Sequence, residues 1–227
     1  MLGPRMRWFI AARSRITEEA LTVAVENGAT QFVVLGAGLD TLAYRIPFAD
    51  RLRIFEVDYP ATQAWKREML AAASIAAPVT LSFVAVDFER QTLAEALESA
   101  GFSMAAQSFF SWLGVVPYLT EHAVFSTLDY IAKLPGGAEV VFDYVNPAAS
   151  IAPAGRAVHR ALAERTAALG ETIQSYFDTE PLCAKLRAAG FRCLDDIGPE
   201  RIATRFFPAS EHSAPARGGH VMHTSTG

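Results

Sequence analysis

The segment over residues 31–60 constrains the fold more than any other part of the chain. It reads QFVVLGAGLDTLAYRIPFADRLRIFEVDYP and contains two short runs rich in β-branched and aromatic residues, Phe32–Leu35 and Arg53–Val57. Such runs are typical of buried parallel strands. The first leads directly into Gly36-Ala37-Gly38, and the second ends in acidic residues. This layout predicts the nucleotide-binding half of a doubly wound α/β sheet.

The glycine loop after the first run favours S-adenosylmethionine over a dinucleotide as the cofactor. Gly36 and Gly38 fill two of the three glycine positions of the dinucleotide fingerprint G-x-G-x-x-G, but Thr41 stands at the third. Asp40 also places a carboxylate where a pyrophosphate would approach, and like charges repel. A ligand with a ribose and an adenine but no phosphates fits this loop better. Gly36, Ala37 and Gly38 would let the backbone come close to it.

Longer motifs around these residues resemble a known family. LGAGLDTLAYR followed by FEVDYPATQAWKR is similar to the leucine carboxyl methyltransferase family, and more narrowly to its bacterial branch of S-adenosylmethionine-dependent methyltransferases. The resemblance runs from about residue 9 to residue 134 and is specific in the blocks AARSRI, LGAGLDT with FEVDYP, and SWLGVVPYLT. It implies a class I enzyme that transfers a methyl group to a carboxylate or hydroxyl of a small molecule.

The order of the predicted elements agrees with the fold that the resemblance implies. Further strands are expected over 80–86, 108–113, 139–144, 191–197 and 220–224, with helices over 5–27, 61–72, 92–100, 120–134, 156–169 and 180–189. Alternating strands and helices predict a mostly parallel sheet with helices on both faces. We therefore expect an α/β, Rossmann-like class I methyltransferase fold with seven strands, as one domain over residues 1–227. Residues 146–179 are expected to form a cap insertion over the ligand cleft.

Two carboxylates at the end of the second strand, Glu56 and Asp58, are candidates for binding the ribose hydroxyls. We expect only one of them to face the ligand. The family pattern favours Asp58, and Glu56 is then expected to bind nearby backbone or one of Arg45 and Arg53. The alternative role for Asp58 is the N-cap of the following helix, in which Pro60 takes the first position.

The resemblance assigns further cofactor contacts. Asp87, which ends a strand in VAVDFER, matches the family's adenine contact, and the backbone of Phe88 can reach a ring nitrogen. Arg13 in AARSRI matches the arginine that holds the methionine carboxylate of the cofactor. The alternatives are a turn residue for Asp87 and a solvated helix face for Arg13. Gly114 is expected to line the site. Leu113 stands where many family members have a glutamate beside the cofactor's amino group, so no role passes to Leu113.

Composition restricts the remaining function classes. The net charge of −4 disfavours a nucleic-acid partner, because phosphate backbones are bound through an excess of Lys and Arg. Cys183 and Cys193 form neither a disulfide framework nor a metal motif, and we assign no metal and no catalytic residue. Without a signal-peptide pattern or an uninterrupted spanning segment, the protein is expected to be cytoplasmic and not to enter the membrane. A dinucleotide-dependent oxidoreductase is less favoured, because Thr41 replaces the third glycine and no Tyr-x-x-x-Lys pair is present.

Apolar residues on two predicted helices lead to opposite expectations. Family members usually have several dozen residues ahead of AARSRI, whereas this sequence starts close to it. Without such preceding residues, the first helix would leave four apolar side chains uncovered: Trp8, Phe9, Ile16 and Leu21. Since large exposed apolar patches usually bind a partner, we expect a homodimer through this end. In the family the preceding residues form helices over the active site, so we also expect a weakly active enzyme or a non-catalytic cofactor-binding protein. On the helix over 61–72, Trp65 and Met69 are expected to lie in the core.

Overall fold

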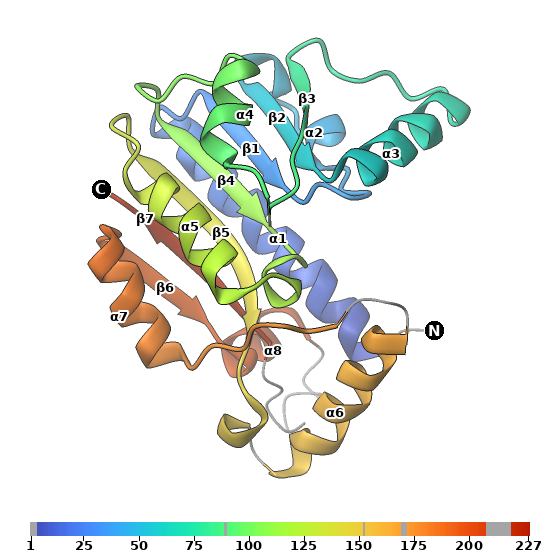
Figure 1. The fold of residues 1–227 in the computed structure, drawn as a ribbon, viewed down its shortest axis with the longest axis vertical. Helices are drawn as coiled ribbons and strands as arrows, with labels where there is room; N and C mark the ends of the chain where they lie inside the picture. Colours follow the sequence, from blue (N-terminus) through green and yellow to red (C-terminus); the bar gives the residue numbers. More distant parts are fainter. Residues whose placement is uncertain (1–3, 89, 152, 169–171, 208–218) are drawn as a thin grey trace.

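A seven-stranded sheet runs through the centre of the protein in the strand order β3-β2-β1-β4-β5-β7-β6 (Figure 1). The computed structural model describes residues 4–88, 90–151, 153–168, 172–207 and 219–227. The strands are β1 (Gln31–Leu35), β2 (Arg53–Asp58), β3 (Leu81–Ala85), β4 (Ser108–Trp112), β5 (Ala138–Val145), β6 (Cys193–Ile197) and β7 (Gly219–Ser225). The first five strands pair in parallel, and β7 runs antiparallel between β5 and β6. The predicted mostly parallel sheet of seven strands is confirmed.

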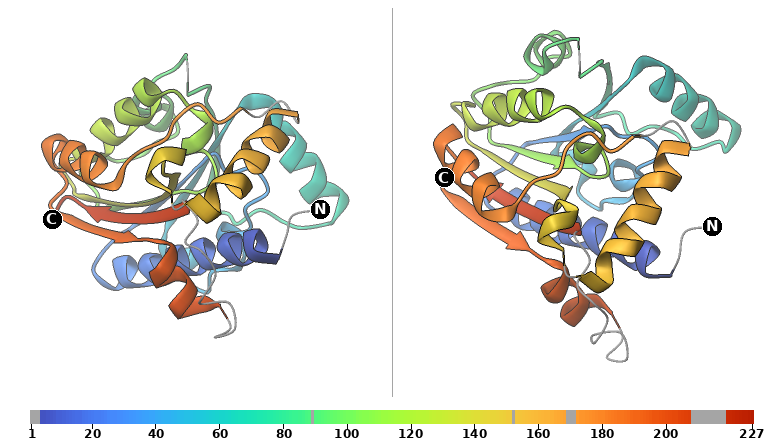
Figure 2. Two further views of the ribbon diagram at one scale, coloured as in Figure 1. Left: turned by 90° about the horizontal axis from the view of Figure 1, so that it is seen from below. Right: turned by 60° about the horizontal axis from the view of Figure 1, so that its bottom comes forward.

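Helices cover both faces of this sheet (Figures 1 and 2). One face packs against α1 (Pro4–Glu26), α2 (Leu42–Arg45), α3 (Pro60–Ala72) and α8 (Pro199–Phe206). The other face packs against α4 (Leu93–Ser99), α5 (Glu121–Ala132) and α7 (Thr179–Ala189). Short 3₁₀ helices η1 (Ala49–Arg51), η2 (Val116–Tyr118) and η3 (Ala148–Ser150) lie in the connections. The remaining helix, α6 (Pro153–Ala168), lies beyond the carboxyl ends of the strands.

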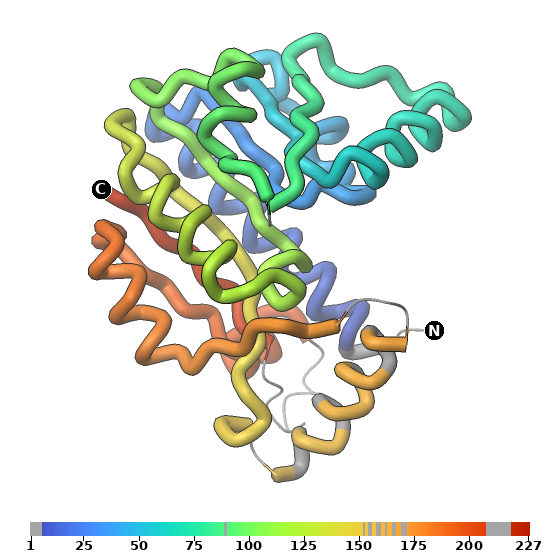
Figure 3. Tube along the Cα trace, viewed as in Figure 1, coloured from blue at the N-terminus to red at the C-terminus, as the bar shows by residue number. Residues whose placement is uncertain are grey.

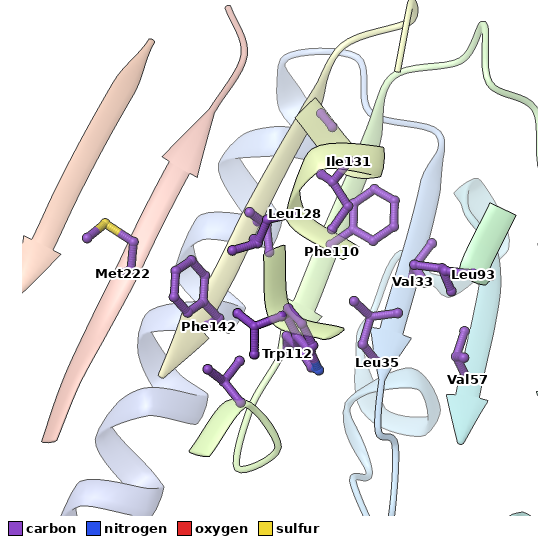
Figure 4. Packing of buried hydrophobic residues seen from close by; sticks show 14 of the residues in the cluster. Val33, Leu35, Val57, Leu93, Phe110, Trp112, Leu128, Ile131, Phe142 and Met222 are labelled. Atoms are coloured by element: carbon purple, nitrogen blue, oxygen red, sulfur yellow. The ribbon is translucent and has the colours of Figure 1, made fainter. Parts of the chain in front are cut away.

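Apolar side chains fill the space between the sheet and its helices. On the face of α4, α5 and α7, the strand residues Val33, Leu35, Phe110 and Phe142 pack in one cluster with Leu128 of α5 (Figure 4). Each of these side chains is exposed by 1% or less. Complete burial of such a side chain contributes about 1.5–3 kcal/mol to stability. The strands are therefore rich in β-branched and aromatic residues because both faces of the sheet are covered by helices.

Local sequence signals set several helix ends, and Pro60 takes the position predicted for it. Pro60 is the first residue of α3. An N–H group at this position has no acceptor within the helix, so proline loses no hydrogen bond there. Thr120 caps α5, since its Oγ1 accepts a hydrogen bond from Ala123 N at 3.3 Å. Gly190 ends α7 at a φ of 122°, a backbone angle that residues with a Cβ rarely adopt.

The third helix, α3, buries polar side chains and exposes the apolar ones. Trp65 and Met69 are 49% and 50% exposed, so their assignment to the core is wrong. The buried side chains of α3 are Gln63 and Lys66. Gln63 Nε2 donates a hydrogen bond to the backbone oxygen of Glu56 at 3.3 Å. The i, i+4 spacing of Trp65 and Met69 marks a common helix face, but the sheet packs against a different face of α3.

The first helix, α1, packs against the rest of the chain along the face that was expected to be uncovered. Ile16 and Leu21 are buried in the core on this side of the sheet. Trp8 and Phe9 are half-buried, and the Trp8 ring lies 5.2 Å from the ring of Phe207. The expectation that Ile16 and Leu21 are uncovered is therefore wrong, and the homodimer itself stays a prediction.

The described residues that lead into α7 cross the carboxyl edge of the sheet (Figure 3). The backbone amide of Gln174 donates to the oxygen of Pro117 in η2 at 2.7 Å, and that of Phe177 donates to Val145 at the end of β5 at 3.0 Å. This segment belongs to the expected cap insertion over 146–179. Residues 152 and 169–171 of that insertion lie outside the described residues.

Within the described ranges, no helix is both long enough and apolar enough to cross a membrane. Cys183 and Cys193 are both free thiols.

Candidate cofactor-binding site

The residues predicted to bind the cofactor gather at one edge of the sheet. Residues 36–38 follow β1, Asp58 ends β2, Asp87 lies two residues after β3, and Gly114 lies two residues after β4. These strands are parallel neighbours in the sheet, so their carboxyl ends meet along the same edge (Figure 1). Segments far apart in the sequence are thus placed around one location.

The glycine loop is held between the end of β2 and the loop after β4. The backbone amides of Gly36 and Ala37 donate to the oxygen of Val57 at 2.7 and 3.1 Å. Gly36 has a φ of 64°, and a Cβ at this position would lie 2.3 Å from Val115 Cγ2. Only glycine fits such a contact, because real Cβ atoms do not approach other atoms so closely. The absence of a side chain at Gly36 thus lets the loops after β1 and β4 meet.

Asp58 lies at the tip of β2 and is half-buried. Its Oδ2 accepts a hydrogen bond from Gly38 N at 2.5 Å, and its Oδ1 accepts one from Tyr59 N at 2.6 Å. A carboxylate offers about four acceptor positions, so two remain after these two bonds. Asp58 therefore fixes the glycine loop and can still accept hydrogen bonds from ligand hydroxyls. The N-cap residue of α3 is Tyr59 and not Asp58.

Glu56 differs from Asp58 in how deeply it is buried, and not in the face of the sheet to which it points. Residues two apart on a strand point to the same face, but Glu56 is 1% exposed and lies below the edge. Its Oε1 pairs with Lys66 Nζ at 2.8 Å, and its Oε2 accepts a hydrogen bond from the Tyr44 hydroxyl at 3.3 Å. Burial raises the pKa of Glu56, and the Lys66 ammonium opposes that rise. Glu56 is therefore a buried structural charge and does not reach the ligand edge.

The expected partners of Glu56, Arg45 and Arg53, are occupied elsewhere. Arg45 pairs with Glu18 of α1, and the Arg53 guanidinium lies 5.6 Å from the centre of the Phe55 ring. The assignment of either arginine to Glu56 is wrong. Lys66 takes this role because α3 turns its polar face toward β2.

Lys66 also connects α3 to the loop that follows the glycines. Its Nζ donates to the backbone oxygen of Asp40 at 2.8 Å and lies 5.3 Å from the centre of the Tyr44 ring. The Asp40 carboxylate accepts a hydrogen bond from Leu42 N at 2.6 Å, at the start of α2. One buried ammonium group thus joins β2, α3 and the segment after the glycine loop.

The segment after β3 supplies the predicted adenine contacts. Asp87 is half-buried, its backbone amide donates to Gln91 Oε1 at 2.9 Å, and its Oδ2 lies 3.6 Å from Arg90 Nε. The ring of Phe88 packs against Trp112 of β4, with 6.1 Å between ring centres. The structure therefore places both residues at the carboxyl edge of the sheet, beside the end of β4.

Arg13 of α1 reaches the end of β4 and pairs there with Asp143, a residue that sequence reasoning missed. Arg13 Nη1 lies 2.6 Å from Asp143 Oδ2, and Gly114 N donates to Asp143 Oδ1 at 2.6 Å. Gly114 has a φ of 75°, and a Cβ there would lie 2.8 Å from Arg13 Nη2. Arg13 is thus not on a solvated helix face. A sequence signal for Asp143 existed, since it is an acid within the last residues of a predicted strand.

A second polar cluster lies at the ends of β5 and β6 and was also missed. The Tyr144 hydroxyl donates to Asp196 Oδ1 at 2.9 Å and lies 2.8 Å from Thr179 Oγ1, and His220 Nδ1 lies 2.9 Å from Asp196 Oδ2. Burial is the main cause that raises the pKa of Tyr144, so its hydroxyl stays protonated. This cluster joins β5, β6, β7 and α7. Among the described residues, no three His, Cys, Asp or Glu side chains are grouped to hold a metal ion.

Comparisons with known proteins agree with this arrangement. The sequence profile described as leucine carboxyl methyltransferase matches residues 2–132, more than half of the chain. YktD of Bacillus subtilis strain 168, named as a candidate S-adenosyl-L-methionine-dependent methyltransferase, is 34% identical over 200 residues, covering 86% of this chain and 65% of YktD. A protein of Saccharopolyspora erythraea with the same description is 37% identical over 122 residues, covering 54% of this chain and 42% of the relative. The matches thus cover 65% and 42% of the length of these two relatives.

Two solved structures share the fold. A candidate O-methyltransferase from Nostoc punctiforme PCC 73102 aligns with a TM-score of 0.59 at 12% identity, over 93% of this chain and 56% of that one. The magnesium protoporphyrin IX methyltransferase of Synechocystis PCC 6803, solved with bound S-adenosylhomocysteine, aligns with a TM-score of 0.57 at 9% identity, over 100% of this chain and 89% of that one. The α/β sheet therefore has the Rossmann-like methyltransferase topology.

The buried Glu56–Lys66 pair gives a stability prediction. Replacing Lys66→Met leaves the Glu56 carboxylate buried without its cation, and we expect a loss of about 3–5 kcal/mol in the free energy of unfolding. Because the folded-state pKa of Glu56 then rises further above the unfolded value, the loss should shrink as the pH falls from about 7.5 to about 5.5. Urea unfolding at both pH values measures this. The double variant Lys66→Met/Glu56→Gln should recover most of the loss, and an unchanged midpoint in Lys66→Met would contradict the role of the pair.

Proposed function

The chain belongs to the leucine carboxyl methyltransferase family, and from this premise we propose that it binds S-adenosylmethionine and methylates a carboxylate or hydroxyl oxygen of a small molecule. The observation that carries the proposal is the convergence of the glycine loop, Asp58 and Asp87 at the carboxyl ends of β1, β2 and β3. Ligands of doubly wound sheets bind outside this edge, at the point where the strand order reverses. Here that point lies between β1 and β4.

The adenosine half of the cofactor fits the first three strand ends. The backbone of Gly36, Ala37 and Gly38 can approach it closely, because a Cβ at Gly36 is excluded by Val115. The remaining acceptor positions of Asp58 suit the two ribose hydroxyls. Asp87 and the backbone of Phe88 would accept from and donate to the adenine edge.

The methionine half fits the ends of β4 and β5. The guanidinium of Arg13 is held against Gly114, and its Nε is buried with no hydrogen-bond partner among the described residues. A ligand carboxylate beside it would supply the missing acceptor. We assign Arg13 to that carboxylate and Gly114 to the wall of the site.

The chain's own contribution to the chemistry is alignment and the exclusion of water. Bound S-adenosylmethionine supplies a methyl group activated by a sulfonium. A carboxylate acceptor is already ionised at neutral pH, so the chain need supply no general base. Holding the acceptor oxygen in line with the methyl group lowers the barrier, and a water-poor site favours a reaction in which the sulfonium charge disappears.

The segment over 146–179 is proposed to cover the acceptor side of this site, within one domain over residues 1–227. Ser175 is buried, its Oγ donates to the oxygen of Val116 at 2.9 Å, and Gln174 Nε2 donates to the oxygen of Tyr118 at 2.6 Å. These contacts hold Gln174 and Ser175 against η2, the 3₁₀ helix that follows β4. A small molecule placed between this segment and the cofactor would be shielded from water.

Cofactor choice tests the proposal directly. We expect isothermal titration calorimetry to detect binding of S-adenosylmethionine and S-adenosylhomocysteine, and to detect none for NAD or NADP. The reason is the Asp40 carboxylate, which follows the glycine loop and would repel a pyrophosphate. Binding of NAD that is tighter than that of S-adenosylmethionine would sink the assignment in favour of an oxidoreductase.

The role of Asp58 is tested by substitution. Asp58→Ala should weaken S-adenosylhomocysteine binding by about 1–3 kcal/mol, because ribose hydroxyls lose a charged acceptor. Asp58→Asn keeps an oxygen for Gly38 N and should lie between Asp58→Ala and the parent protein. The exposed Asp50→Ala is the matched control and should leave affinity unchanged. If Asp58→Ala binds as tightly as the control, Asp58 serves only to hold the glycine loop.

A further inference from the structure

Arg13 and Asp143 form an ion pair that is largely withdrawn from water at the candidate site. Their side chains are 18% and 5% exposed, and 2.6 Å separates Arg13 Nη1 from Asp143 Oδ2. They come from α1 and β5, 130 residues apart in the sequence. A buried ion pair is weak evidence for stability, because the cost of removing two charges from water can exceed their attraction. A binding role would explain why both charges lie at this edge.

Both partners have hydrogen-bonding capacity beyond the pair. Arg13 Nε is buried and has no acceptor among the described residues. Each oxygen of Asp143 accepts a hydrogen bond, one from Arg13 and the other from Gly114 N, while a carboxylate can accept about four. The two groups can therefore bind a ligand without first leaving each other.

The surrounding chain holds the pair in a fixed position. A Cβ at Gly114 would come within 2.8 Å of Arg13 Nη2, so the guanidinium lies directly against the backbone after β4. The Phe9 ring lies 5.9 Å from the guanidinium carbon. Leu113, the residue before Gly114, is apolar, and the carboxylate beside this end of β4 comes from Asp143 of β5.

A fixed cation beside a fixed anion is complementary to an α-amino acid, in which a carboxylate and an ammonium group are attached to one carbon. We propose that Asp143 binds the α-ammonium group of the cofactor's methionine end, and that Arg13 and Asp143 together are the receptor for this zwitterion. The inference rests on the proposed function. The ligand carboxylate lies toward Arg13 and the ammonium toward Asp143, so each charge gains a partner of opposite sign.

The test uses two adenosyl thioethers that each keep one of the two charges. The 3-aminopropyl thioether of 5′-deoxyadenosine keeps the ammonium group, and the 3-carboxypropyl thioether keeps the carboxylate. Titration calorimetry measures both against the parent chain, Asp143→Asn and Arg13→Gln. Asp143→Asn should lose about 10- to 100-fold in affinity for the aminopropyl ligand and bind the carboxypropyl ligand as well as the parent or better. Arg13→Gln should show the reverse pattern.

Equal losses for both ligands in both variants would overturn the proposal and leave the pair a structural contact. 5′-Methylthioadenosine, which lacks both charges, controls for folding and should bind all three proteins alike. If a single variant fails to fold, the neutral pair Arg13→Gln/Asp143→Asn takes its place and should bind methylthioadenosine normally and S-adenosylhomocysteine at least 10-fold more weakly. A parent chain that binds none of the adenosyl ligands would overturn the proposed function itself. If the parent chain binds them and neither substitution changes the affinity, only the role of the ion pair is overturned.

Discussion

The close approach of two loops, after β1 and after β4, is the contact on which the rest of the site depends. Gly36 allows it, since a Cβ there would lie 2.3 Å from Val115 Cγ2. The same loop donates two backbone hydrogen bonds to Val57 at the end of β2. The carboxyl ends of β1, β2 and β4 therefore lie close together, which brings Asp58 and Gly114 to the same site. A side chain at Gly36 would push the loops apart and open the edge where the cofactor is proposed to bind.

Charges around this edge are each matched before any ligand arrives. Asp58 accepts from two backbone amides, Glu56 pairs with Lys66, and Asp143 pairs with Arg13. Such pairing fixes the directions of the side chains and lowers the entropy lost on binding. It also divides the work between the carboxylates. Glu56, buried below the edge, stabilises the loop through Lys66, whereas the half-buried Asp58 remains available to a ligand.

The sequence predicted the strands and the glycine loop well, because both depend on local chemistry. Runs of β-branched residues mark buried strands, and an acid at the end of the second strand can be recognised from its position in the sequence. Lys66 and Asp143 could not be assigned their partners, because those contacts depend on how distant segments pack. Trp65 and Met69 were placed in the core wrongly, since helical spacing identifies a face but not which face meets the sheet. Here the tertiary pairing of Lys66 with Glu56 decides the orientation of α3.

We propose that the cofactor binds along the carboxyl edge between β1 and β4. Hydrogen–deuterium exchange with and without S-adenosylhomocysteine tests it across the whole sheet. The account predicts slower exchange in the loops over residues 36–40, 58–60 and 113–118, because their backbone amides would be covered or held by the ligand. The loops at the opposite edge, over residues 104–107 and 135–137, should be unchanged. Protection at that opposite edge, or at the exposed face of α3 without any change in residues 36–40, would contradict the account.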